Sequence, residues 1–385
     1  MDFTLADDVD AIRGAVRALC SGFPGEYWRG LEPDRYPEEF VTELTRQGWL
    51  AALIPEDYGG SGLSLGTASV ILEEISASGG NPGACHAQMY VMGTLLRHGN
   101  EAQKRKYLSA IAAGELRLQA FGVTEPNAGS DTTRIATLAR RTDDGYVVDG
   151  QKIWTSRAEH SDLMVLLART TPLAEIEKKT DGLSVFLVDM RDRGSELTIK
   201  PIKTMMNHAT TEVFFDGLKL PADALIGEEG KGFRYILDGM NAERILIASE
   251  CIGDGRFFLA RATAYAKERK VFGRPIGSNQ GIQFPLARAH MAVQAADLMR
   301  WKAAWLYDAG QPSGAEANMA KFLASEASWQ AANAAMDTHG GFGFAAEYDI
   351  ERKFRETRLY QVAPISNNLV QAFIGQHVLG LPRSY

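Results

Sequence analysis

Apolar residues in the first third of the chain recur at helical spacing. They run from Val9 to Leu19 on one helical face, and a second helix is expected after Pro37, with acidic residues in its first turn. Asn100 suits the N-cap position of another helix. The pattern therefore predicts an N-terminal helical domain over residues 1–118.

Beyond residue 118, short apolar or half-alternating segments replace the helical spacing. Turn clusters such as Asp143-Asp144-Gly145 separate these segments, which is typical of strands. The segments are 118–123, 146–148, 163–167, 183–188 and 212–215. Because no long helical pattern lies between them, an antiparallel barrel or sandwich is expected over residues 119–229, not a parallel sheet with crossover helices.

Helical spacing returns in the C-terminal part of the chain. Long patterns at about 231–268, 281–309 and 314–338, joined by short loops, predict an antiparallel helical bundle over residues 230–385. Two shorter helices are expected at about 348–358 and 366–379. The predicted fold class is an α+β multidomain protein with a helical domain, a central β domain and a four-helix-bundle-like domain.

Composition narrows the possible partners. Of the 385 residues, 45% are apolar and 23% charged, and the net charge is −7, whereas a nucleic-acid backbone requires a concentrated basic face. The three cysteines lie far apart, without metal-ligand spacing, which suggests a reducing compartment. The acidic N-terminus lacks the apolar core of a leader, and no apolar run could cross a bilayer, so a cytoplasmic protein without membrane insertion is expected.

The loop Thr124-Glu125-Pro126-Asn127-Ala128-Gly129-Ser130-Asp131 is the first candidate for chemistry. It follows an apolar strand, and its proline, asparagine and glycine force a turn. Its side chains offer many donors and acceptors, and its amides are expected to be free of any ladder, which suits an anionic ligand. Taken alone, the loop is equally well explained as an ordinary turn between strands.

Four further motifs follow this loop along the chain, and together they identify a protein family more specifically than the loop alone. They are Gln151-Lys152-Ile153-Trp154-Thr155-Ser156, Glu268-Arg269-Lys270-Val271-Phe272-Gly273, His339-Gly340-Gly341-Phe342-Gly343-Phe344 and Arg358-Leu359-Tyr360-Gln361. Together with the loop at residues 124–131, they closely resemble the acyl-CoA dehydrogenase family over essentially the whole chain. The resemblance implies bound FAD between the β domain and the helical bundle, an acyl-CoA substrate, electron-transferring flavoprotein as acceptor, and a homotetramer built as a dimer of dimers.

The resemblance also assigns cofactor residues. Residues matching the wall of the flavin site are Phe121, Val123, Thr124, Ser130, Trp154 and Ser156. Residues matching contacts to the partner subunit's FAD are Arg269, Phe272, Gln280, Gly340 and Gly341, with Ser366 matching a position near the pyrophosphate. Asp337 stands where the family commonly has glutamine, which puts that cofactor contact in doubt.

Substrate contacts follow from the same resemblance. Ser130 matches a residue that contacts CoA, and Asn241 and Arg244 match positions beside the thioester and pantetheine. Met89 and Tyr90 are expected to line the acyl chamber, with Cys85, His86 and Met92 as further candidates. His86 is more often a structural histidine, although it could recognise a polar acyl tail.

The implied reaction is α,β-dehydrogenation of the acyl-CoA to a trans-2-enoyl-CoA, in fatty acid or branched-chain acyl catabolism. One carboxylate must remove the α-proton while the β-hydride passes to flavin N5. One of the family's two positions for that glutamate is occupied here by Pro364, which cannot accept a proton, and the other by Glu243. Glu243 is therefore the predicted base, with Glu250 as a rival on nearly the same helix face.

Other activities remain open on the same fold. An enoyl-CoA reductase of the crotonobetainyl-CoA type would reverse the chemistry, and an acyl-CoA oxidase would change the electron acceptor. A DNA-binding relative of the alkylation-response proteins is disfavoured by the acidic net charge. At residues 203–210 the chain departs from common members, with Met205 and Asn207 in place of glycine and arginine.

Overall fold

The structure is a computed structural model that describes residues 7–192 and 194–383. Residues 1–6, the first part of the N-terminal segment at 1–10 on which the expectation of no leader rests, lie outside the described residues. The chain divides into two compact units. We call Met1–Glu32, Ser64–Pro82 and Asn241–Tyr385 the helical unit, and Pro33–Leu63 with Gly83–Met240 the sheet unit.

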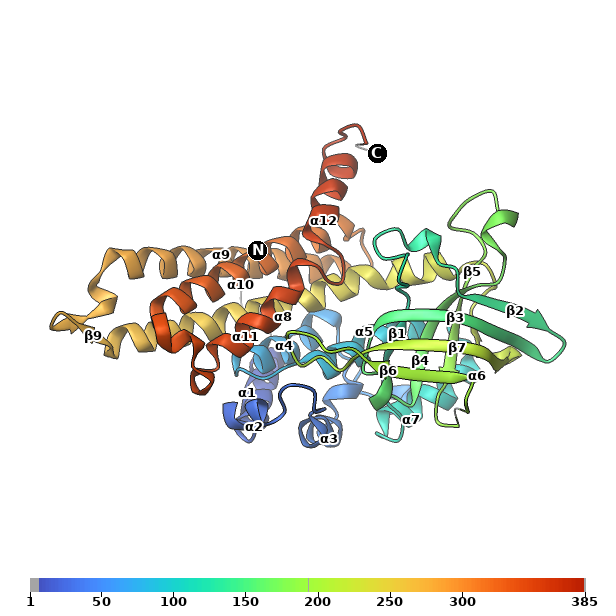
Figure 1. The fold of residues 1–385 in the computed structure, drawn as a ribbon, viewed down its shortest axis with the longest axis horizontal. Coiled ribbons are helices and arrows are strands. Elements are labelled where there is room, and N and C mark those ends of the chain that lie inside the picture. Colours follow the sequence, from blue (N-terminus) through green and yellow to red (C-terminus); the bar gives the residue numbers. More distant parts are fainter. Residues whose placement is uncertain (1–6, 193, 384–385) are drawn as a thin grey trace. The chain divides into compact units, whose positions relative to one another are not determined.

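The sheet unit is built on one sheet. Within the described residues its eight strands have the order β6-β7-β3-β2-β4-β5-β8, with β1 paired to β4 (Figure 1). The strands are β1 (Leu118–Gly122), β2 (Leu138–Thr142), β3 (Gly145–Ser156), β4 (Leu163–Arg169), β5 (Leu183–Asp189), β6 (Leu197–Pro201), β7 (Thr210–Pro221) and β8 (Leu225–Ile226). The predicted central β domain is confirmed.

The pairing of these strands is mixed, so the expectation of a wholly antiparallel domain is wrong in two places. β1 runs parallel to β4, from Leu118 opposite Leu163 to Gly122 opposite Leu166, and β2 meets β4 in parallel at Leu138. The chain between β1 and β4 contains the β2–β3 hairpin, which is long enough to bring β4 back in the same direction as β1. The other pairings are antiparallel.

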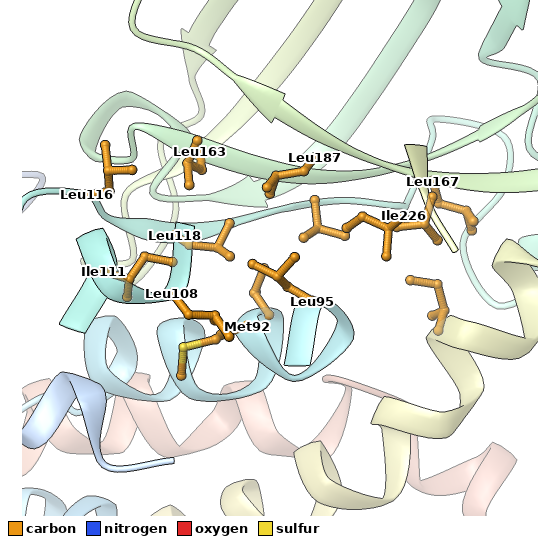
Figure 2. Close-up of a cluster of buried hydrophobic side chains, with 14 of the residues drawn as sticks. Met92, Leu95, Leu108, Ile111, Leu116, Leu118, Leu163, Leu167, Leu187 and Ile226 are labelled. Carbon is orange, nitrogen blue, oxygen red and sulfur yellow. The ribbon is translucent and has the colours of Figure 1, made fainter. Parts of the chain in front are cut away.

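Helices cover one face of this sheet. They are α5 (Gly83–His98), α6 (Glu101–Gln103) and α7 (Ser109–Ala112), with a π-helical turn, Lys104–Leu108, between the last two. Helix α3 (Glu38–Arg46) packs against α5. Asn100 caps α6 as predicted: its side chain accepts from the Gln103 amide, and the Gln103 side chain accepts from the Asn100 amide. Figure 2 shows Met92 and Leu95 facing Leu118 and Leu187 across this contact.

The helical unit contains the predicted bundle. Its elements are α1 (Asp7–Ser21), α2 (Gly25–Gly30), α4 (Leu65–Ala77), α8 (Gly232–Glu268) from Asn241 on, β9 (Lys270–Val271), β10 (Arg274–Pro275), α9 (Gln280–Asp308), α10 (Gly314–His339), α11 (Ile350–Thr357) and α12 (Asn367–Phe373). All three long and both short C-terminal helices are confirmed. In the described part of the chain, no helix has both the length and the apolarity needed to cross a membrane.

Helix α9 has two different faces at a spacing of seven residues. Ala289, Ala296 and Ala303 are fully buried, and α9 and α10 lie side by side in Figure 1. Small side chains on such a face permit close approach of the two helices. A second row of large apolar side chains is exposed; it consists of Phe284, Met291, Leu298 and Trp305. We call this row the α9 stripe.

The core beneath the sheet sets a first prediction. Leu95 is fully buried in the cluster of Figure 2, so Leu95→Ala should leave a cavity and lower the free energy of unfolding by about 2–5 kcal/mol. Urea titration followed by circular dichroism measures the change. Leu173→Ala is the control, because Leu173 is 42% exposed and should cost far less. Equal losses for the two variants would contradict this assignment of the core.

Candidate functional site

The loop after β1 is held to β3 by backbone hydrogen bonds. The Ile153 amide donates to the Thr124 carbonyl oxygen at 2.9 Å. Glu125 and Ala128 close the turn on each other, with N–O distances of 3.2 and 3.0 Å. The expectation that the loop amides are free is therefore wrong for these two residues. Ser130, at the end of the loop, is exposed.

A buried ion pair between Lys152 of β3 and Glu125 of the loop also holds this loop in place. The Lys152 ammonium lies 2.8 Å from Glu125 Oε1 and also donates to the Val123 carbonyl oxygen. Glu125 Oε1 also accepts from the Thr137 amide at 2.9 Å, and Oε2 accepts from the Ala136 amide at 2.7 Å. One carboxylate thus joins the loop, β3 and the segment leading into β2.

Both charges of this pair are perturbed by their surroundings. Burial lowers the pKa of Lys152 to about 8, although the Glu125 charge opposes that shift. Burial alone would raise the pKa of Glu125, but the Lys152 charge and the two amide donors hold it below its ordinary value. The pair is therefore ionised at neutral pH, and each charge depends on the other.

Arg169 supports the segment that follows the loop. Its guanidinium is buried and donates to the carbonyl oxygens of Ile135, Thr133, Asp181 and Lys179. These acceptors lie on two different connections, so a single side chain at the end of β4 holds both. Carbonyl oxygens thereby satisfy a guanidinium that would be costly to bury alone.

A bulge at the end of β3 turns Trp154 out of the sheet. Lys152 lies opposite Val213 and Thr155 opposite Thr211, so β3 has one residue more than β7 between these pairs. Trp154 has φ 62°, in the left-handed region that a tryptophan rarely adopts, and its side chain is 57% exposed. Such strain is retained where the surrounding structure fixes it, commonly at functional sites.

Hydrogen-bonding groups flank this exposed ring. The Thr155 hydroxyl is buried without a partner among the described residues, and half-buried Ser156 pairs with Thr210 of β7. The half-buried Thr124 follows β1 and is joined to β3 by its carbonyl. An exposed aromatic ring at a strand end that also carries the half-buried Ser156 fits a planar cofactor with a polar edge, as the resemblance to the acyl-CoA dehydrogenases implies.

The predicted acyl wall lies on α5. Met89 is buried and Tyr90 half-buried. The Tyr90 ring lies edge-to-face on Phe121 of β1 at 5.6 Å and on His86 at 5.0 Å. The structure thus joins three of the predicted residues, Phe121, Tyr90 and His86, in one row.

The unusual segment at residues 203–209 has defined contacts. Asn207 Nδ2 donates to the Arg35 carbonyl oxygen at 2.8 Å, and His208 Nδ1 lies 3.4 Å from Arg157 Nη2. Burial, together with the charge of Arg157, keeps the pKa of His208 well below its ordinary value. The contact of Asn207 gives a physical account of one of the two residues, Met205 and Asn207, that depart from the family pattern.

In the helical unit, the predicted base lies near the start of that unit's part of α8. Glu243 is 8% exposed, and its neighbour Arg244 donates to Asn241 Oδ1 at 2.9 Å. Burial lowers the pKa of Arg244, while the Glu243 charge opposes that shift. The three predicted residues Asn241, Glu243 and Arg244 therefore form one local group.

Glu250 belongs to a separate buried network. Its carboxylate accepts from the Tyr360 hydroxyl at 2.9 Å, and burial together with the Glu250 charge raises the pKa of Tyr360 well above its ordinary value. One turn further on, Asp254 lies 2.7 Å from the Lys353 ammonium, which also contacts Glu356. Burial raises the pKa of Asp254 to about 6.

The residues assigned to the partner's FAD gather at the far end of α8. Phe272 and Gly273 both have positive φ and form the two-residue turn of the β9–β10 hairpin, which leaves the Phe272 ring fully exposed. The Arg269 guanidinium lies 5.8 Å from the Phe342 ring, beside Gly341. About 38 Å of helix separates this end of α8 from Glu243.

Three predicted cofactor residues remain, and each lies at or near the end of a helix. Gln280 is the first residue of α9, and Asp337 is exposed near the end of α10. The Ser366 hydroxyl accepts from the Leu369 amide at 3.4 Å and caps α12. The capping of α12 by Ser366 follows the ordinary preference for serine before the first turn of a helix.

Comparisons with known proteins agree with this architecture. The chain matches three family models: the acyl-CoA dehydrogenase N-terminal domain over residues 6–115, the middle domain over 120–218 and the C-terminal domain over 230–378. It is 36% identical over 389 residues to the acyl-CoA dehydrogenase FadE12 of Mycobacterium tuberculosis, covering 100% of this chain and 99% of that protein.

Two further relatives show the range of the group. A 3-(aryl)acrylate reductase of Clostridium sporogenes is 33% identical, with 89% of this chain and 91% of that protein covered. The structure of butyryl-CoA dehydrogenase from Megasphaera elsdenii has a TM-score of 0.89 and 31% identity, covering 98% of this chain and 100% of that one. The chain belongs to the acyl-CoA dehydrogenase family. It is an oxidoreductase, and the family is one of flavoproteins.

Sequence analysis missed the ion pairs that support the site. It named Lys152 only as part of the motif at residues 151–156 and Glu125 only as part of the loop at residues 124–131, and it did not pair them. Their signal was a lysine on the buried side of a strand, which requires a carboxylate partner. The contact between Arg157 and His208 had no comparable signal.

The Glu125–Lys152 pair gives a prediction with a pH dependence. Glu125→Gln leaves the Lys152 charge buried without its carboxylate, which should lower the free energy of unfolding by about 3–5 kcal/mol at pH 7. The pKa of Glu125 is lowered on folding, so its contribution is complete above the ordinary value of 4.5 and is lost as the pH falls below it. Urea titrations at pH 7 and pH 4 should show the difference from wild type shrinking.

Glu38→Gln is the control for this experiment. Glu38 pairs with Arg117, but its side chain is 55% exposed, so the loss should stay below about 1 kcal/mol. A loss for Glu125→Gln no larger than for Glu38→Gln would show that the pair does not hold the loop.

Proposed function

We propose that this protein binds FAD and dehydrogenates an acyl-CoA thioester to the trans-2-enoyl-CoA. The observation that carries the proposal is Glu243, a carboxylate 8% exposed beside Arg244 and Asn241, in a chain whose other family position for a base is Pro364. A carboxylate withdrawn from water is a suitable base for a weakly acidic α-proton. Membership of the acyl-CoA dehydrogenase family supports the substrate class.

The sheet unit would hold the flavin. Trp154 presents its ring from the β3 bulge, and the hydroxyls of Thr124 and Ser156 offer hydrogen bonds at the edge of the cofactor. When bound, FAD supplies a hydride acceptor at its N5 atom. Ser130 at the loop end is proposed to contact CoA, and Met89 and Tyr90 to line the acyl chain.

The helical unit would supply the proton chemistry. Glu243 takes the α-proton, and Arg244 and Asn241 hold the thioester side of the substrate. Glu250 is proposed to support the structure around the site, because its carboxylate accepts a hydrogen bond from the Tyr360 hydroxyl within a buried network. Electron-transferring flavoprotein is the proposed electron acceptor. Reduction of an enoyl-CoA is the second candidate, supported by the relative named 3-(aryl)acrylate reductase.

A homotetramer is part of the proposal. Arg269 and Phe272 lie about 38 Å of helix away from Glu243, which favours their serving the FAD of a second subunit, together with Gln280, Gly340 and Gly341. The exposed α9 stripe repeats every seven residues, the spacing with which one helix packs lengthwise on another. Exposed apolar rows of this size mark interaction surfaces. We also propose domain boundaries near residues 118 and 229.

Substitution of the base gives a direct prediction. Glu243→Gln should keep bound FAD. The rate at which acyl-CoA bleaches the flavin should fall by at least about 10²-fold, because the general base is gone. Stopped-flow absorbance of the flavin, with a panel of acyl-CoAs differing in length and branching, measures the rate.

Glu250→Gln is the matched control, one carboxylate seven residues away on α8. It should retain most of the bleaching rate. Loss of bleaching in Glu250→Gln with retention in Glu243→Gln would exchange the two roles. A colourless purified protein that takes up no FAD would overturn the proposed function itself.

Subunit assembly gives another prediction. Leu298→Glu, in the middle of the α9 stripe, should place a charge in the proposed subunit contact and reduce the molar mass measured by light scattering. Bound FAD should fall with it, since Arg269 and Phe272 of a second subunit would be lost. Leu173→Glu, an exposed leucine of the sheet unit, is the control and should leave the mass unchanged. A tetramer in Leu298→Glu would refute the stripe as the contact.

A further inference from the structure

Three nitrogen-bearing side chains of the sheet unit gather outside the residues assigned to cofactor or thioester. Arg157 directly follows Ser156 at the end of β3, and its Nη2 atom lies 3.4 Å from Nδ1 of His208. His208 also interacts electrostatically with His86 of α5. We call Arg157, His208 and His86 the basic cluster. Arg157 and His86 are both buried, although a guanidinium is normally exposed.

The backbone holds Arg157 in a fixed position. Arg157 has φ 59° and Ala209 has φ 47°, both in the left-handed region. The Arg157 amide donates to the Ala209 carbonyl oxygen at 2.7 Å, and the Arg157 carbonyl oxygen accepts from the Ser161 hydroxyl at 2.9 Å. Non-glycine residues keep this conformation only where the surroundings enforce it. The segment carrying His208 is therefore tied to the segment carrying Arg157 by backbone as well as side chain.

The protonation states follow from the geometry. A guanidinium only donates, so Nδ1 of His208 accepts from Arg157 and the ring proton lies on Nε2. Burial, together with the charges of Arg157 and His86, lowers the pKa of His208 well below its ordinary value, so the ring is neutral at pH 7. The basic cluster thus keeps the positive charge of Arg157 and adds an N–H donor from His208.

The position of the basic cluster relates it to the acyl wall. His86 lies edge-to-face on Tyr90, and Tyr90 lies edge-to-face on Phe121 of β1. The row therefore runs from the strand assigned to the flavin, past the acyl-wall residue Tyr90, to His86. An acyl chain following this wall away from the flavin would bring its far end towards a cationic group with several donors.

The geometry points to an acyl-CoA substrate whose acyl chain ends in a carboxylate, which Arg157 and the Nε2–H of His208 bind while His86 closes the same end. This assignment rests on the proposed acyl-CoA function and names its substrate class. A guanidinium offers parallel N–H groups that match a carboxylate, and a charge-assisted bond of this kind is strong where water is excluded.

The experiment compares two thioesters of equal chain length on the flavin-loaded enzyme: hexanoyl-CoA and the mono-CoA thioester of hexanedioic acid. Unreactive thioether analogues of both are titrated by calorimetry, and the thioesters are followed by flavin bleaching. Wild type should bind the carboxylate-ended analogue more tightly. Arg157→Met should reduce that preference by about 10- to 100-fold, the size of one charge-assisted bond. Arg157→Lys should restore part of it.

Two further variants keep the test decisive if Arg157→Met does not fold. His208→Gln should weaken the preference in the same direction, and His86→Leu should do so to a smaller extent. Arg117→Met is the matched control, because this arginine pairs with Glu38 and should leave the preference unchanged. A wild-type preference for hexanoyl-CoA, or a preference unaffected by His208→Gln and every folded Arg157 variant, would overturn the inference.

The two proposals can fail separately. If neither thioester bleaches the flavin but the analogues show the preference and its loss in the variants, dehydrogenation is wrong and the carboxylate site stands. If both thioesters bleach the flavin while the analogues bind equally to wild type, the carboxylate site is wrong and dehydrogenation stands.

Discussion

The buried contact between Glu125 and Lys152 is the constraint on which the proposed flavin-binding wall of the sheet unit depends. The loop after β1 carries Thr124 and Ser130, and the end of β3 carries Trp154 and Ser156. Neither segment could hold its geometry alone, since the loop is a short turn and the strand end is bulged. The Glu125–Lys152 ion pair and the backbone bond from Ile153 to Thr124 tie them together, and the amides of Ala136 and Thr137 hold the same carboxylate from the segment leading into β2. The cost of burying two charges is recovered only when all these partners are present.

Much of the fold was predictable because it depends on local pattern. The long helices α8, α9 and α10 begin and end within a few residues of the expected positions, since the apolar spacing is encoded within each segment. The parallel pairing of β1 with β4 was not predictable, because the pattern of one strand does not identify its neighbour. Buried charges were missed for the same reason: Lys152 finds its partner 27 residues away.

The candidate site residues could likewise be predicted only in part from the sequence. Residues such as Glu243 and Thr124 could be named from motifs by resemblance, but their surroundings could not. The structure adds that Glu243 lies in a local group with Arg244 and Asn241, while Glu250 accepts from Tyr360. Two carboxylates on one helix, indistinguishable by spacing, therefore have different surroundings: the Tyr360 hydroxyl at Glu250 and the Arg244 guanidinium at Glu243. That difference separates a proposed base from a proposed support, and no pattern along α8 contains it.

Strain is concentrated where chemistry is proposed. Among the described non-glycine residues, five have positive φ, and three of them, Trp154, Arg157 and Ala209, lie at or beside the joined ends of β3 and β7. A further one, Phe272, forms the hairpin turn assigned to a second subunit's cofactor. A sheet formed only for stability would relax such positions to glycine or to extended backbone. Their persistence at strand ends that the Glu125–Lys152 pair already fixes indicates that the direction of the Trp154 and Arg157 side chains is what the strain serves.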